Sequence, residues 1–225
     1  MEDKESVSGI TRSLYSRLAG VGLIGTLIAI LLEHGVGQSI GGTSLYGVHD
    51  ASQVAAFYGH STLRAVYWLC TGLLPFFILF AIAFRGYVNS FGRSIATDIF
   101  FAMMIVEAPL LLAHLGLNIA LVDFMPTNQP NILLGVFASM DGIYNNGLEI
   151  IEVWWMGALA TASWKLGALP RWLASWAGIT AIGLAFNYSA RYLQLPEGAL
   201  MPTYALFALW MLTVGIVLLR GSTKE

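Results

Sequence analysis

The stretch Ile132-LLGVFASMDGIYNNGLEIIEVWWMGALATAS-Trp164 is longer than one bilayer crossing requires, yet it carries Asp141, Glu149 and Glu152. A membrane-spanning helix needs about 20 predominantly apolar residues. Carboxyl groups inside such a helix are costly, and they usually face a bundle interior, a water-filled cavity or a substrate path. The stretch therefore predicts a membrane helix with a functional face, and its length predicts that it tilts, protrudes or breaks near Gly142.

The composition of the whole chain agrees with a membrane location. Of the 225 residues, 57% are hydrophobic and only 11% are charged, whereas soluble domains carry about 25% charged residues. The length allows one helical bundle, so residues 1–225 are expected to form a single all-α domain. The net charge of -2 says little about partners. The absence of a basic patch argues against nucleic acid, and the membrane composition predicts membrane lipids as partners. The single cysteine, Cys70, excludes an intrachain disulfide.

Six apolar segments approach or exceed the length of a bilayer crossing. They predict a polytopic protein with six transmembrane helices in one bundle, near residues 14–34, 63–84, 96–121, 132–163, 172–193 and 199–220. Pro109 falls inside the third segment, where a kink is expected. The long connection from Gly35 to Ser61 is expected to form a lid or a short surface helix around Ala51–Tyr58.

Basic residues indicate the orientation of these helices. Nine of the 11 lie at the chain ends or in the loops that follow the second and fourth segments: Lys4, Arg12, Arg17, Arg85, Arg93, Lys165, Arg171, Arg220 and Lys224. All of these positions share one membrane face, and basic loops stay in the cytoplasm. The sequence therefore predicts a multi-pass protein of the inner (plasma) membrane with both termini in the cytoplasm.

Two glycine-containing patterns begin at this cytoplasmic face, Arg17-LAGVGLI-Gly25 and Arg171-WLASWAGITAI-Gly183. Small residues at such spacing let neighbouring helices approach closely. We interpret them as two similar packing faces rather than as a true internal repeat.

Polar residues in the apolar segments form a candidate site. With a turn of about 100° per residue and Asp141 at zero, Asn145, Glu149 and Glu152 fall near 40°, 80° and 20°, on one stripe. In the third segment, Glu107, His114 and Asn118 share a side. The first segment ends in Glu33 and His34, and the fifth carries Asn187 and Arg191 near its outer end. We expect an outward-facing polar cavity between the third, fourth and fifth segments, closed by the end of the first.

The chemistry of these groups suggests binding, and acid–base conversion, of a small lipophilic or amphipathic molecule. Glu149 and Glu152 are the candidate acid and base, because burial favours the protonated form of a carboxyl group. Glu107 and His114 are their candidate partners. Orientation of the ligand is assigned to Asp141, Asn145, Asn187, Arg191, Glu33 and His34.

Several alternatives stay open. The same groups could relay protons in a proton-coupled carrier, or bond to partner helices in a homo-oligomer or a larger membrane complex. They could also simply hold the bundle together, with Arg191 paired to Glu107 or Glu149. A metal site is not predicted, because the sequence lacks the His-x-x-His and Glu-x-x-His spacings. The sequence identifies no cofactor, and it contains no Gly-x-Ser-x-Gly or phosphate-binding glycine loop.

The segment Trp164-KLGALP-Arg171, followed by Trp-Leu-Ala-Ser-Trp-Ala-Gly178, resembles a bacterial membrane family known as domain of unknown function four-three-eight-six. Arg17-Leu-Ala-Gly, Leu63-Arg64 and Val106-Glu107-Ala108 are also similar to its pattern. The chain departs from the pattern at Met104, where family members often carry arginine, and in the acidic run from Glu149 to Glu152. The resemblance implies six helices and cytoplasmic termini, and it implies no activity.

Overall fold

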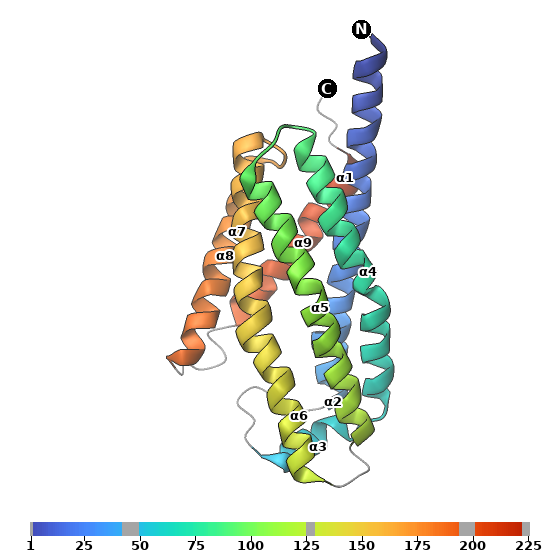
Figure 1. Cartoon of the computed structure of the whole chain (residues 1–225), viewed down its shortest axis with the longest axis vertical. Helices are drawn as coiled ribbons and strands as arrows, with labels where there is room; N and C mark the ends of the chain where they lie inside the picture. Colours follow the sequence, from blue (N-terminus) through green and yellow to red (C-terminus); the bar gives the residue numbers. More distant parts are fainter. Residues whose placement is uncertain (1, 42–49, 125–128, 194–200, 222–225) are drawn as a thin grey trace.

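The computed structural model describes residues 2–41, 50–124, 129–193 and 201–221, and these residues form helices and no strands (Figure 1). The long helices are α1 (Glu2–Ile30), α4 (Thr62–Asn89), α5 (Ile95–Phe124), α7 (Glu149–Leu166), α8 (Arg171–Tyr192) and α9 (Met201–Arg220). Short helices α2 (Gln38–Gly41), α3 (Ala51–Tyr58) and α6 (Pro130–Gly142) lie at one end of the molecule. The chain is therefore all-helical, as predicted.

Two π-helical segments extend the long helices. η1 (Leu31–Gly37) continues α1, and η3 (Ile143–Leu148) joins α6 to α7. The predicted fourth segment is thus helical throughout; near Gly142 it changes its winding instead of breaking. A π-helix has i→i+5 hydrogen bonds and is frequent at functional sites. Both segments carry residues of the candidate site.

Four helices among the described residues are long and apolar enough to cross a membrane: Thr11–Gly37, Thr62–Asn89, Ile95–Phe124 and Pro202–Arg220. They correspond to the predicted first, second, third and sixth segments. The predicted fourth and fifth segments are helical over residues 130–166 and 171–192, and neither is among these four helices. α4 and α5 run unbroken through Pro75 and Pro109, respectively.

The long helices pack as a ring in the order α1, α4, α5, α7, α8 and α9, with α9 returning to α1. Glycines make the contacts of α1 close. A Cβ at Gly22 would lie 2.5 Å from Phe80 N in α4, and one at Gly20 would lie 2.9 Å from Gly215 O in α9. Gly183 of α8 packs in the same way against Thr203 of α9. The interpretation of the two glycine-containing patterns as packing faces is therefore confirmed.

One end of the ring is filled by a large apolar core. Its fully buried side chains include Phe80, Phe84, Phe100, Met156 and Trp210, which come from four helices. α1 begins and α9 ends near this end, and the α4–α5 and α7–α8 turns also lie there (Figure 1). Arg12 donates hydrogen bonds to Ser90 Oγ and O, which fix the α4–α5 turn. Tyr87 donates to Ala168 O and fixes the α7–α8 turn. We call this the basic end, because Arg85, Arg93, Lys165 and Arg171 lie in or beside its turns.

α3 covers the opposite end, which we call the cap end. Asp50 caps this helix: Oδ1 accepts hydrogen bonds from Ser52 N (2.7 Å) and Gln53 N (3.0 Å). These bonds, with that from the Ser52 hydroxyl, hold the pKa of Asp50 below its usual value. Val54, Phe57 and Tyr58 are buried, so the short helix expected at Ala51–Tyr58 is confirmed.

Candidate functional site

A cavity of about 380 Å³ lies inside the ring, on the cap side of the apolar core. Helices α1, α4, α5, α7 and α9, together with η1 and η3, contribute its walls, and α8 contributes none of the lining residues. Three lining residues are exposed: Leu31, Gly35 and Ala205. Leu31 and Gly35 belong to η1, and Ala205 lies near the start of α9, so we take the seam between these two segments as the opening.

The ring order corrects the expected position of the cavity. The sequence placed it between the third, fourth and fifth segments. In the structure the fifth segment, α8, packs outside α7 and α9, while the first, second and sixth segments line the cavity. Asn187 is fully buried in α8 but is not among the lining residues. Arg191 belongs to α8, and its side chain lies outside the described residues.

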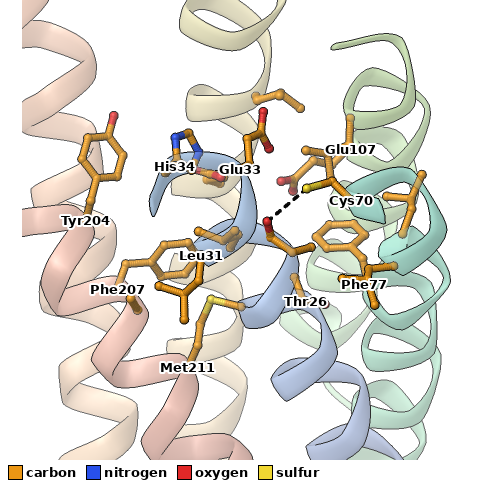
Figure 2. A pocket seen from close by; sticks show the side chains of 18 of the residues that line it. Thr26, Leu31, Glu33, His34, Cys70, Phe77, Glu107, Tyr204, Phe207 and Met211 are labelled. Atoms are coloured by element: carbon orange, nitrogen blue, oxygen red, sulfur yellow. Dashed lines mark hydrogen bonds between the residues drawn. The ribbon is translucent and has the colours of Figure 1, made fainter. Parts of the chain in front are cut away.

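Most of the cavity wall is apolar. In the view of Figure 2, Glu33, His34 and Glu107 lie in the upper part of the pocket, whereas Phe207 and Met211 lie in the lower part. Glu152, His114, Tyr144 and Tyr204 complete the polar lining. The cavity therefore offers a polar region and an apolar region to one occupant.

Glu33 and His114 join two helices that are far apart in sequence. Glu33 Oε1 accepts a hydrogen bond from His114 Nε2 at 2.7 Å, and this contact is an ion pair when the ring is protonated. His114 Nδ1 is buried, with no hydrogen-bond partner among the described residues. This bond therefore joins the end of the predicted first segment to the third at the cavity wall.

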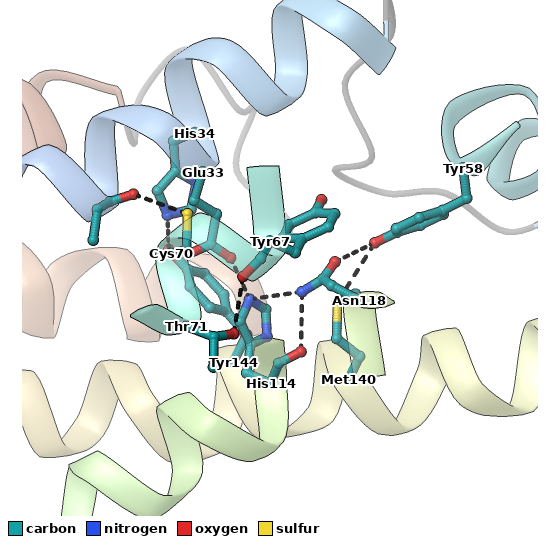
Figure 3. Close-up of polar contacts among 11 residues, drawn as sticks. Glu33, His34, Tyr58, Tyr67, Cys70, Thr71, His114, Asn118, Met140 and Tyr144 are labelled. Atoms are coloured by element: carbon teal, nitrogen blue, oxygen red, sulfur yellow. Dashed lines mark hydrogen bonds and ion pairs between the residues drawn. The ribbon is translucent and has the colours of Figure 1, made fainter. Parts of the chain in front are cut away.

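Asn118 extends this bond toward the cap (Figure 3). Its Nδ2 lies 3.2 Å from His114 Nε2 and donates to His114 O at 3.1 Å. Its Oδ1 accepts a hydrogen bond from the Tyr58 hydroxyl at 2.6 Å. Burial raises the pKa of Tyr58 well above its usual value, which keeps the hydroxyl protonated as a donor. A polar chain therefore runs from the cavity wall to α3.

A smaller cavity of about 90 Å³ lies beneath α3. It shares Glu33, His34, His114 and Tyr144 with the main cavity, so these four side chains stand between the two spaces. The Tyr144 hydroxyl lies 3.5 Å from His34 Nε2, and its ring centroid lies 5.2 Å from that of His114. This contact joins the two π-helical segments.

Asp141 and Asn145 line only the smaller cavity. Asn145 Nδ2 donates to Asp141 Oδ1 at 2.6 Å, as expected for residues one turn apart. Both residues therefore belong to the cap side of the site, in the neighbourhood of Tyr58 and Met140.

Glu107 and Glu152 face the main cavity from α5 and α7, and their carboxyl groups are close enough to interact electrostatically. Glu107 is 2% exposed, and its Oε2 is buried with no hydrogen-bond partner among the described residues. The Trp155 indole lies beside the same carboxyl group. These two residues are the acidic groups nearest the apolar part of the site.

Glu149 differs from the expectation. It is buried and accepts a hydrogen bond from the Tyr204 hydroxyl of α9, and it does not line the cavity. The expected stripe assumed α-helical winding from Asp141 to Glu152. Glu149 and Glu152 both belong to α7 and point about 60° apart, so Glu149 meets Tyr204 of α9 while Glu152 faces the cavity. The wider turn of η3 changes the phase of Asp141 relative to both glutamates. Glu107, rather than Glu149, is the acidic neighbour of Glu152 across the cavity.

Sequence reasoning missed three tyrosines of the site: Tyr58, Tyr144 and Tyr204. Tyr144 lies within the stretch from Asp141 to Glu152, next to Asn145, and this proximity was an available signal. Tyr58 and Tyr204 lie in segments whose position depends on packing. No sequence pattern links them to Asn118 or Glu149.

Among the described residues, no group of three or more His, Cys, Asp or Glu side chains is arranged to hold a metal ion. Comparisons with protein-family models, curated proteins and solved structures find no significant match for this chain. The resemblance to the bacterial six-helix family therefore stays a prediction, and the site has to be interpreted from its own geometry.

Proposed function

We propose that this protein binds a small lipophilic or amphipathic molecule in the cavity inside its helix ring. The observation that carries the proposal is the cavity itself: about 380 Å³, apolar over most of its wall, with Glu33, Glu107 and Glu152 among its few polar lining residues. Ligand pockets are typically concave, mostly apolar and supplied with a few convergent polar groups. An amphipathic occupant satisfies both parts of such a wall.

The proposal includes a six-span topology in a bacterial plasma membrane, with the basic end in the cytoplasm. Arg85, Arg93, Lys165 and Arg171 support this orientation, since short cytoplasmic loops carry an excess of basic residues. The cap end and the opening beside η1 then face the outer leaflet. Residues 130–166 and 171–192 supply the remaining two spans.

The filled basic end favours binding over proton-coupled transport. Phe80, Phe84, Phe100 and Trp210 close the ring on that side. The described ionisable residues of the site all lie on the cap side of this core. A carrier needs access to its site from both faces, and this arrangement gives access from one. The accessory-subunit alternative would need partner helices on the outer surface of the ring.

Native mass spectrometry of the protein reconstituted in lipid nanodiscs tests the proposal. We expect a small molecule to co-purify with the wild-type protein and to be lost from Ala208→Leu, which fills the cavity wall. Ala102→Leu adds the same volume on the exposed face of α5 and is the matched control. Equal retention in both variants, or no bound molecule at all, would contradict the proposal. Co-purification with further protein chains would support the accessory-subunit alternative instead.

Acid–base conversion of the bound molecule is a second candidate function. The interaction between Glu107 and Glu152 favours it, because one carboxyl group can donate a proton while its neighbour accepts one. Incubation of the released molecule with the wild-type protein should then give an isomer that chromatography separates. Glu152→Gln should not produce it. Recovery of the unchanged molecule from the wild-type protein would exclude acid–base conversion, and the proposed binding function would still stand.

A further inference from the structure

The charge of the cavity wall indicates the class of molecule that it prefers, if the proposed binding function holds. Among the described residues that line the main cavity, three are glutamates and none is lysine or arginine. Arg64, a basic residue of the cap end, is half-exposed and lies 3.3 Å from the carboxylate of Asp123. The wall therefore has acidic groups at its polar side and no fixed positive charge.

Glu107 is the most informative of these residues. It is almost fully buried in the centre of the ring, and its Oε2 has no hydrogen-bond partner among the described residues. Figure 2 shows its side chain in the upper part of the pocket, among the residues that line it. A buried carboxyl oxygen without a partner is costly, and a bound group that donates to it or neutralises it offsets this cost.

Glu152 adds a second carboxyl group to the same region. Two carboxylates that face one apolar cavity repel each other, and the positive charge of a ligand beside them offsets this repulsion. The pair therefore gives a cationic group more stabilisation than it gives a neutral group of equal size.

Aromatic side chains surround the space next to these carboxyl groups. Phe77, Phe80, Trp155, Phe207 and Tyr204 all line the cavity. The faces of aromatic rings attract cations, most strongly where water is excluded. The same rings supply apolar contact for the uncharged part of a ligand. No metal-binding group of side chains is present among the described residues, which favours an organic cation over a metal ion.

We infer that the cavity selects a lipophilic organic monocation, an amine or quaternary ammonium compound, with its charge beside Glu107 and Glu152. Its apolar part would occupy the space lined by Phe207 and Met211. The molecule would enter through the seam between η1 and α9, whose lining residues Leu31 and Ala205 are exposed apolar side chains.

Three probes of similar size and different charge test this inference in nanodiscs. Phenyltrimethylammonium is the cation, tert-butylbenzene is its neutral isostere, and benzenesulfonate is an anion. Binding is measured by ligand-observed NMR, and empty nanodiscs correct for partition into lipid. The cation should bind the wild-type protein at least about ten-fold more tightly than the neutral isostere, and the anion should not bind.

Glu107→Gln should remove most of this preference and leave the affinity for tert-butylbenzene unchanged. Retained binding of the neutral probe shows that the variant is folded. Glu152→Gln, the neighbouring carboxyl group, gives an independent second variant. Asp123→Asn removes a carboxylate outside the cavity and should leave all three affinities unchanged.

The outcomes separate the two proposals. Equal binding of the cation and its neutral isostere to the wild-type protein would overturn the charge preference and leave the binding function standing. The charge preference would also be overturned if Glu107→Gln and Glu152→Gln each lowered the affinity for the cation and for the neutral isostere equally. The carboxyl groups would then affect only the structure of the cavity. Absence of binding by all three probes would contradict the cavity's binding function as well.

Discussion

Tyr58 connects the cap helix to the functional site through a single side chain. It is 1% exposed, and its hydroxyl donates to Asn118 Oδ1 at 2.6 Å. Asn118 in turn bonds to His114, whose ring meets Glu33. The position of α3 over the site is therefore coupled to the residues of the cavity wall by consecutive hydrogen bonds.

Tyr58→Phe should lower the free energy of unfolding by about 1–2 kcal/mol, because Asn118 Oδ1 loses its donor in a buried place. The ring and its apolar contacts remain, so the loss reports on the hydrogen bond. Tyr15→Phe at the basic end, where the ring packs on Gly86, is the control and should change stability little. Thermal unfolding in detergent measures both. A Tyr58→Phe variant as stable as the wild-type protein would refute the coupling.

At the scale of the helices, close packing of α1 holds the ring together. Gly22 and Gly25 face α4, and Gly20 faces Gly215 of α9. Small residues at these positions let the helix backbones come into contact. In a bilayer this close van der Waals packing drives helix association, because the hydrophobic effect does not act between helices there. The same helix then continues as η1, where the winding changes and Glu33 and His34 enter the site.

Gly22→Ala should destabilise the protein by roughly 1–3 kcal/mol, because its Cβ would lie 2.5 Å from the Phe80 backbone nitrogen. A backbone atom of a packed helix cannot rotate aside as the end of a side chain can. Gly72→Ala is the matched control. Its Cβ would meet nothing within 4 Å, so helix propensity should make it neutral or stabilising by up to about 1 kcal/mol. Unfolding by sodium dodecyl sulfate in mixed micelles measures the difference. Equal stability of the two variants would show that α1 and α4 are not packed as described.

The interior of the molecule differs between its two ends. The apolar core closes the basic end, while two adjacent cavities and the cap helix occupy the opposite end. In the proposed orientation, with the basic end in the cytoplasm, the site would be accessible from the outer side alone. This asymmetry makes the orientation in the membrane a direct test of the proposed function.

Single cysteines on a Cys70→Ala background test the orientation, with a maleimide that does not cross membranes. His60→Cys lies at the exposed cap end and should be labelled in intact cells. Asn89→Cys lies at the exposed end of α4, on the basic side, and should be labelled only after lysis. The reverse pattern would place the cavity on the cytoplasmic side and contradict the proposed topology.

Local periodicity allowed several features to be predicted from the sequence alone. The six long helical segments, the short helix at Ala51–Tyr58, the glycine packing faces and the shared side of Glu107, His114 and Asn118 all depend on residues close together in the chain. Helical geometry repeats over a few residues, so composition and spacing determine such features.

Only the tertiary structure decided which helices enclose the cavity. Apolar helices can pack in many orders, because lipid and helix neighbours are about equally apolar and leave no distinct pattern on each face. The ring order put α8 outside the cavity and brought Tyr204 of α9 to Glu149. η3 altered the winding between Asp141 and Glu152, so contacts between distant segments, rather than helical phase, determined which carboxyl groups face the site.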